Sequence, residues 1–155
     1  MNIFARIMVK DVDSYRTLIE LTPIETKDEN GVSLLRIAVA SGAEEIALDL
    51  VSRGIEIDQL SKSGMTELQT AFWRGFWDLG RKLIERGASL EHFDSNGNNA
   101  LWYAITHPRP DYDLLKLMVR AGSDVQTKNR AGRSPLDAAR QIGNSKMIEI
   151  LEGKT

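Results

Sequence analysis

The residues best suited to catalysis or metal binding in this sequence are its two histidines, His92 and His107. An imidazole can act as a general acid or base near neutral pH and is a common metal ligand. The two histidines are 15 residues apart, and the repeat pattern described below places them in different loops. The sequence has no cysteine, which excludes disulfides, thiolate zinc sites and cysteine nucleophiles. We therefore expect ordinary loop histidines and predict no catalytic residue, no metal and no cofactor.

Two short motifs resemble ligand-binding loops, and neither meets the requirements. The segment 94–98 (Asp-Ser-Asn-Gly-Asn) begins like a calcium loop, but such a loop needs glycine at its sixth position and a bidentate acid at its twelfth. Those positions are Asn99 and Ile105, so we interpret the segment as a turn whose Asn-Gly pair supplies positive φ angles. The segment 132–134 (Gly-Arg-Ser) lacks the glycine spacing and the lysine of a phosphate loop. Catalysis is therefore not expected.

The composition is that of one globular domain. Of 155 residues, 42% are hydrophobic and 27% are charged, which excludes a disordered chain and a coiled coil. The net charge of −2 argues against a nucleic-acid partner, and no apolar run approaches the ~18 residues of a membrane span. The N-terminal segment 3–9 contains Arg6 and lacks a basic leader and a cleavage site, so it is a poor signal peptide. We expect a cytoplasmic protein that is monomeric when free.

Internal periodicity decides the expected architecture. One series of turn glycines, Gly31, Gly64, Gly97 and Gly132, is spaced by 33, 33 and 35 residues. Leucines and alanines keep the same phase, each leucine three residues before its alanine, and a second glycine series follows at matching intervals. These in-phase positions are Leu35, Leu68, Leu101 and Leu136, then Ala38, Ala71, Ala104 and Ala139, then Gly54, Gly87 and Gly122.

Each repeat is predicted to fold as the same helix–turn–helix unit. A helix-capping residue stands two positions after each turn glycine, and a further glycine breaks the first helix in three of the four repeats. Apolar pairs at four-residue spacing then predict a second helix, which ends at the second glycine series. The capping residues are Ser33, Thr66, Asn99 and Ser134, and the helix-breaking glycines are Gly42, Gly75 and Gly143.

On these residues the chain resembles the ankyrin-repeat family. The family pattern of Asp, two variable residues, Gly, one residue, a Thr-Pro-Leu-His start and a later Ala is recognisable throughout 28–155, most closely at 94–104 and 129–139. The resemblance implies an all-α ankyrin-repeat solenoid in a single domain, 1–155. A helical cap over 1–27, with its turn at 11–15, precedes four helix–turn–helix repeats over 28–60, 61–93, 94–128 and 129–155.

The motif histidine is replaced in every repeat. Because that histidine bonds the capping side chain in the family, we expect this hydrogen bond to be lost or altered here. The replacements are Arg36, Gln69, Trp102 and Asp137.

The resemblance also implies where a partner binds. Ankyrin-repeat proteins usually meet their partners through the hairpin loops between repeats and through the exposed side of the first helices. Carried over by position, the predicted partner-binding residues are Glu29, Lys62, Met65, Trp73, Arg74, Glu91, Phe93, Asp94, Asn98, Arg130 and Arg133.

Three of these positions hold large apolar side chains where solvent would favour polar ones: Met65, Trp73 and Phe93. Exposed apolar groups gathered on one face are typical of a binding hot spot. The alternative is that these side chains fold back and pack on the array. Trp102, at the position of the motif histidine, and Tyr103 are predicted to be packing residues.

Net charge changes along the four hairpin loops. It is −2 over 25–32, −1 over 55–65, −2 over 88–98 and +2 over 123–133. An ordinary solvated surface could show this pattern. It could also orient a protein partner that is basic over most of its contact and acidic at one end.

These observations predict a non-catalytic protein-binding module. Its short, degenerate repeats resemble those of small bacterial ankyrin proteins, some of which are immunity proteins that neutralise a toxin. We predict an inhibitor or immunity protein (an antitoxin) that occludes a toxin or enzyme with a basic surface, with no nucleic-acid or membrane partner. The alternatives are a scaffold or adaptor in a larger assembly, or a protein similar to the small ankyrin inhibitors of cyclin-dependent kinases.

Overall fold

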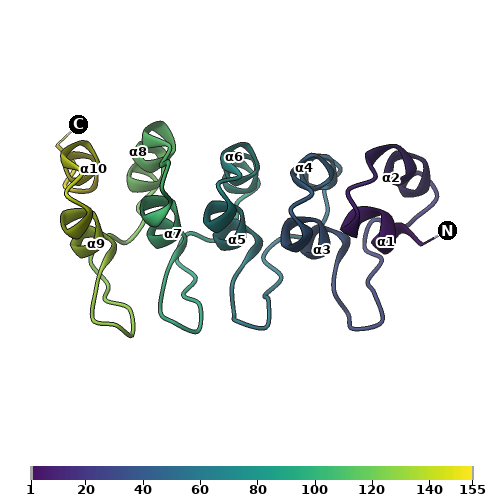
Figure 1. Ribbon diagram of the computed structural model, residues 1–155, viewed down its shortest axis with the longest axis horizontal. Coiled ribbons are helices and arrows are strands. Elements are labelled where there is room, and N and C mark those ends of the chain that lie inside the picture. Colours follow the sequence, from purple (N-terminus) through teal and green to yellow (C-terminus); the bar gives the residue numbers. More distant parts are fainter. Residues whose placement is uncertain (1, 155) are drawn as a thin grey trace.

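The computed structural model describes residues 2–154, and every regular element in that range is helical. Ten α-helices stand in five pairs along one axis, with the chain ends at opposite ends of the row (Figure 1). This confirms the predicted all-α ankyrin-repeat solenoid, whose repeat boundaries stay predictions. The helices are α1 Ile3–Met8, α2 Val12–Ile19, α3 Leu34–Ser41, α4 Glu44–Ser52, α5 Glu67–Arg74, α6 Trp77–Glu85, α7 Ala100–Thr106, α8 Tyr112–Arg120, α9 Pro135–Ile142 and α10 Ser145–Leu151.

The first helix of each of the four repeats begins at its predicted cap. The side chains of Ser33, Thr66, Asn99 and Ser134 each accept a hydrogen bond from the backbone N–H three residues later. This bond satisfies one of the donors that a helix N-terminus leaves unpaired. At the ends of α3, α5 and α9 a glycine adopts a φ of 75–78°, a conformation that disfavours any residue with a Cβ.

The hydrogen bond of the motif histidine is altered rather than lost in two repeats. The Gln69 side chain accepts a bond from the Thr66 N–H at 2.9 Å, and Asp137 accepts one from the Ser134 N–H at 3.0 Å. Together with the bonds in the opposite direction, these form two capping boxes. Gln69 and Asp137 therefore stabilise the helix starts in place of a histidine.

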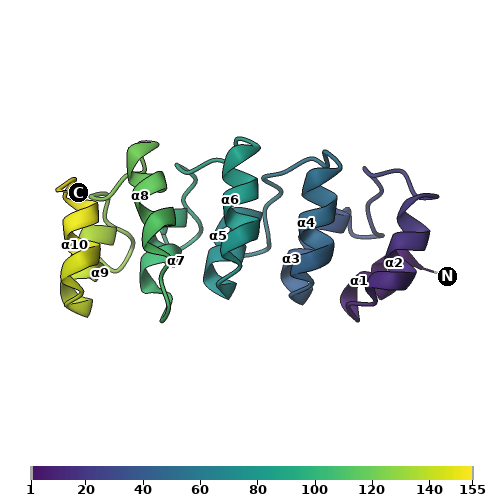
Figure 2. The ribbon, with the colours of Figure 1, turned by 90° about the horizontal axis from the view of Figure 1, so that it is seen from above.

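The helices pack in two rows. The first helices of successive pairs (α1, α3, α5, α7 and α9) contact one another in one row. The second helices form a parallel row, which lies above the first in Figure 1 and in front of it in Figure 2. The in-phase residues fill the space between the rows: Leu35, Leu68 and Leu101 have no exposed surface. The in-phase alanines are also fully buried, and their small side chains let neighbouring helices approach closely.

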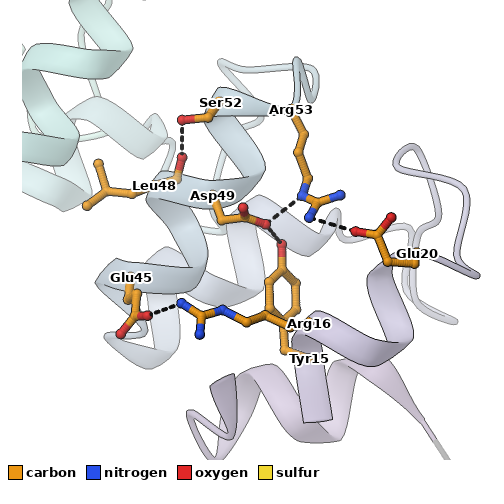
Figure 3. A network of polar contacts seen from close by, with 8 residues as sticks. All are labelled: Tyr15, Arg16, Glu20, Glu45, Leu48, Asp49, Ser52 and Arg53. Carbon is orange, nitrogen blue, oxygen red and sulfur yellow. Dashed lines mark hydrogen bonds and ion pairs between the residues drawn. The ribbon is translucent and has the colours of Figure 1, made fainter. Parts of the chain in front are cut away.

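Polar contacts hold the N-terminal helix pair onto the first repeat (Figure 3). Tyr15 of α2 is buried, and its hydroxyl donates a hydrogen bond to the Asp49 carboxylate of α4 at 2.6 Å. Arg53 pairs with the same carboxylate at 2.6 Å and with Glu20 at 2.8 Å. The cap therefore docks through a network in which Asp49 is shared.

The turn within the cap is shorter than predicted. We expected it at 11–15, but α2 begins at Val12. Asp11 is the N-cap, and its side chain accepts a hydrogen bond from the Ser14 N–H at 3.1 Å. The Asp therefore starts the helix instead of extending the turn.

The hairpin loops project from one side of the array, next to the first helices (Figure 1). In three of them one side-chain oxygen accepts two backbone N–H groups, which fixes the turn. The oxygen belongs to Asp28, Asp94 or Asn129. Backbone bonds from Ser95 to Ser63 (3.2 Å) and from Arg130 to Asn96 (2.9 Å) join successive loops.

Candidate protein-binding surface

Trp73 is the most exposed of the predicted apolar positions, with 60% of its surface open to solvent. It lies near the end of α5, on the row of first helices. An open hollow of about 340 Å³ lies between this ring and the next repeat. The other residues that line the hollow are Tyr103, Thr106, His107 and Pro108.

Arg74 is half-buried beside Trp73. Its guanidinium carbon lies 5.6 Å from the centre of the Trp73 ring and 6.0 Å from that of Phe76. The guanidinium also donates a hydrogen bond to the backbone carbonyl of Ala40, at the end of α3. Arg74 therefore links two repeats and supports one side of the exposed indole, which is a favourable cation–π arrangement.

Met65 and Phe93 are less exposed than Trp73. Met65 is half-buried, and its backbone is bonded on both sides, to Ser61 at 3.1 Å and to the Arg36 guanidinium at 3.2 Å. Phe93, in the loop before Asp94, is 38% exposed. The three apolar positions are therefore unequal, and Trp73 offers the largest exposed apolar surface of the three.

The charged loop positions are open to solvent. Glu29, Lys62, Glu91, Arg130 and Arg133 are all exposed. Within residues 2–154 none of them takes part in an ion pair with another side chain. Their charges are therefore not neutralised by close neighbours in the chain.

The structure corrects the placement of Asp94 and Asn98, which are buried, with 7% and 9% of their surfaces exposed. One Asp94 oxygen accepts the N–H groups of Asn96 (2.8 Å) and Asn98 (3.0 Å), and the other accepts the Tyr103 hydroxyl. The Asn98 side chain accepts a bond from that of Asn129 at 2.8 Å. Both residues hold loops together, so we leave them out of the candidate surface.

Tyr103 stays a neutral hydrogen-bond donor in this arrangement. Burial, and then the bond to Asp94, raise the pKa of Tyr103 to about 12. Its ring is half-buried, so it packs as predicted, but one side also lines the hollow next to Trp73.

The two histidines are not ordinary exposed loop residues, because both are half-buried. His92 Nε2 lies 2.6 Å from the Gly64 carbonyl oxygen, which ties two hairpin loops together. The His107 ring packs edge-on against Trp77, with ring centres 5.0 Å apart. Across residues 2–154 there is no group of three or more acidic or imidazole side chains able to hold a metal. Nor does any helix there combine the length and hydrophobicity needed to cross a membrane.

A second hollow at the C-terminal end includes a residue that the sequence analysis missed. Ile142, at the end of α9, is 52% exposed. The signal in the sequence is an apolar residue directly before a helix-ending glycine, at a position where Arg74 stands in an earlier repeat. The hollow is lined by Trp102, Thr106, Arg133, Ala138, Gln141 and Ile142.

Known proteins share this repeat. The chain is 32% identical over 132 residues to the B-cell lymphoma 3 protein homolog of Mus musculus, a match that covers 84% of this chain and 28% of that protein. It is 30% identical over 126 residues to a putative ankyrin repeat-containing protein of Treponema pallidum, covering 81% of this chain and 42% of the relative. The chain thus spans less than half the length of these relatives.

The family assignment rests on a match over most of the chain. The family described as ankyrin repeats (3 copies) matches residues 35–129, which contain α4 to α8 and all of α3 except its first residue. Ankyrin repeats are protein–protein interaction units, and the successive first helices α3, α5 and α7 in this range contact one another. The chain belongs to the ankyrin-repeat family.

Proposed function

We propose that this chain is a non-catalytic protein-binding module that inhibits its partner by covering a functional surface. The observation that supports this most directly is the exposed Trp73 beside an open hollow. A large aromatic ring left in solvent costs free energy unless a partner covers it, and tryptophan is enriched at the centres of protein interfaces.

The surroundings of Trp73 favour binding to a preformed surface. Arg74 holds one side of the ring, and capped helices and joined loops fix the backbone around it. A surface that is ordered before binding loses little conformational entropy on association. Such a rigid array is suited to occlusion.

Charge favours a partner with a basic surface. Glu29 and Glu91 are exposed on two of the three loops with negative net charge, without ion-pair partners among the described residues. Complementary charge speeds association, while buried aromatic contacts slow dissociation. We propose a cytoplasmic toxin or enzyme with a basic active-site surface as the target, which would make the chain an immunity protein or related inhibitor.

The proposal is tested by isolating the partner from the native cell with the full chain as bait and measuring its activity in the complex. Inhibition of the partner is the expected result. Replacing Trp73 (Trp73→Ala) should cost about 2 kcal/mol of binding, or about 30-fold in Kd, without unfolding the protein. Binding is measured by calorimetry and folding by circular dichroism.

Leu117→Ala is the matched control, because Leu117 is also exposed but lies on α8 in the second row. It should leave Kd unchanged. A partner that keeps its full activity in the complex contradicts inhibition and favours the adaptor role. A Trp73→Ala variant that binds normally removes Trp73 from the interface.

A further inference from the structure

We propose that the C-terminal end of the first-helix row holds a carboxylate-binding site, built by Arg133 on the face of Trp102, for an acidic segment of a protein partner. The segment would present an Asp or Glu side chain next to an apolar one. This inference rests on the proposed protein-binding function and names the chemistry of one part of the partner.

Arg133 makes three defined contacts, one through its backbone and two through its guanidinium. Its backbone N–H donates to Asn129 Oδ1 at 3.1 Å, its guanidinium carbon lies 5.6 Å from the centre of the Trp102 ring, and its Nη1 donates to Gln141 Oε1 at 2.9 Å. Gln141 is a neutral acceptor and uses one donor of the planar fork. The other N–H groups are therefore oriented and open to a carboxylate, the acceptor whose geometry matches them best.

The guanidinium has no acidic partner in residues 2–154. Some arginines of the chain, such as Arg86, donate to backbone carbonyls, and others pair with carboxylates, as Arg53 with Asp49 and Arg140 with Glu152. Arg133 forms no such pair, although its position between α7 and α9 is fixed. A guanidinium without an acidic partner in its own chain can bind an anionic group of another molecule.

The charge of the surrounding loop supports an acidic ligand. The loop 123–133 has a net charge of +2, and Lys128 and Arg130 are exposed in it. Two acids close to Arg133 in the sequence accept backbone N–H groups: Asp124 accepts those of Gln126 and Thr127, and Asp137 accepts that of Ser134. Neither acid forms an ion pair with Arg133 among the described residues.

An apolar surface borders the same site. The hollow that Arg133 and Trp102 line continues to Ala138 and to Ile142, which is 52% exposed. A carboxylate bound to Arg133 would therefore have an apolar contact beside it. Because the other three loops are acidic, a long polyanion would be repelled along the array, which favours a protein segment over a nucleic acid.

The test selects peptides from a phage-displayed library of random 12-residue sequences, using the full chain as bait. Peptides that pair Asp or Glu with a neighbouring apolar residue should be enriched. For the best peptide, changing its acidic residue to the amide should raise Kd at least about tenfold, and the variant Arg133→Gln should lose most of its affinity for the original peptide. Both losses should shrink at high salt.

Arg120→Gln is the matched control, since Arg120 is exposed on α8 and forms no ion pair among the described residues. It should leave Kd unchanged, and circular dichroism should show Arg133→Gln to be folded. Selected peptides without acidic residues, an affinity that survives Arg133→Gln, or tighter binding of a single-stranded oligonucleotide would each overturn the inference. If the selected peptides instead lose binding only in Trp73→Ala, the site at Arg133 is wrong while the proposed binding function stands.

Discussion

At the scale of single residues, burial distinguishes acids that look alike in the sequence. Glu67, the first residue of α5, is fully buried, and no side chain in the described part of the chain donates a hydrogen bond to its carboxylate. The charged groups that face it are Arg36 and Asp58. Arg36 donates its own hydrogen bonds to Met65 and Thr70, so it offsets only part of the cost of burying the acid. Burial is the largest of the effects that raise the pKa of Glu67 to about 7.

Glu67 should make stability depend on pH. Its pKa is higher in the folded chain than the ordinary value of 4.5, so folding favours the protonated acid. The stability that this contributes is complete below pH ~4.5 and is lost as the pH rises through about 7. Glu67→Gln, which stays neutral, should therefore be more stable than the natural chain at pH 8, on the order of 1–3 kcal/mol. Urea denaturation at several pH values measures the difference.

The gap between the two chains should close as the pH falls towards 5, because the natural acid is then protonated too. Glu29→Gln is the control, since Glu29 is exposed in a hairpin loop. It should show no such pH-dependent gain. A Glu67→Gln chain that is less stable at every pH would mean that the carboxylate is a favourable partner of Arg36.

Sequence reasoning could not find these buried polar residues. The repeat register gives the position of a residue within its repeat, but not whether its side chain points to solvent or into the protein. Asp94 occupies a loop position that we assigned to partner contact, yet it turns inward because two backbone N–H groups and the Tyr103 hydroxyl converge on it. For Trp73 the sequence left both an exposed contact and packing on the array open, and the structure shows the ring 60% exposed near the end of α5.

At the scale of elements, the positions of the helices can be predicted from nearby residues, whereas the packing of the N-terminal cap on the first repeat cannot. Capping residues and glycines act within one helix, so the starts of α3, α5, α7 and α9 could be predicted from the sequence. The bond between Tyr15 and Asp49 joins residues 34 positions apart, outside any repeat motif. The cap lacks the family pattern. Its two helices could be predicted from the sequence, but the hydrogen bonds that join them to the first repeat could not.

Tyr15 should contribute measurably to the docking of the cap. Removing its hydroxyl (Tyr15→Phe) deletes a bond to a charged acceptor in a buried position and should cost about 1–2 kcal/mol of unfolding free energy. Tyr112→Phe is the comparison, because that hydroxyl accepts a bond from the neutral Asn144 side chain at 2.8 Å. It should cost less, about 0.5–1 kcal/mol. Denaturant titration of both variants checks the order, and an unchanged Tyr15→Phe would show that Arg53 alone satisfies Asp49.

At the scale of the whole molecule, the array has one looser junction. Successive first helices contact each other along the entire row, whereas α6 and α8 contact each other less than the other neighbouring second helices do. The loop 107–111, which lengthens this repeat, lies at the same place. Side chains bridge the junction there: His107 packs on Trp77, and Arg81 of α6 pairs with Asp111, the N-cap of α8.

Because each helix pair contacts mainly its neighbours, the array should open in parts rather than as one unit. We expect native-state hydrogen exchange to show a lower opening free energy for α8–α10 than for α3–α6, with the boundary at the α6–α8 junction. Arg81→Ala should lower the value for α8–α10 by about 0.5–1 kcal/mol and leave α3 and α4 unchanged, because the pair it removes is only partly exposed to solvent. Lys82→Ala is the control, since among residues 2–154 Lys82 forms an ion pair only with Glu85 of the same helix. A single opening free energy shared by all helices would instead mean that contacts along the first row couple the repeats strongly enough to hide the looser junction.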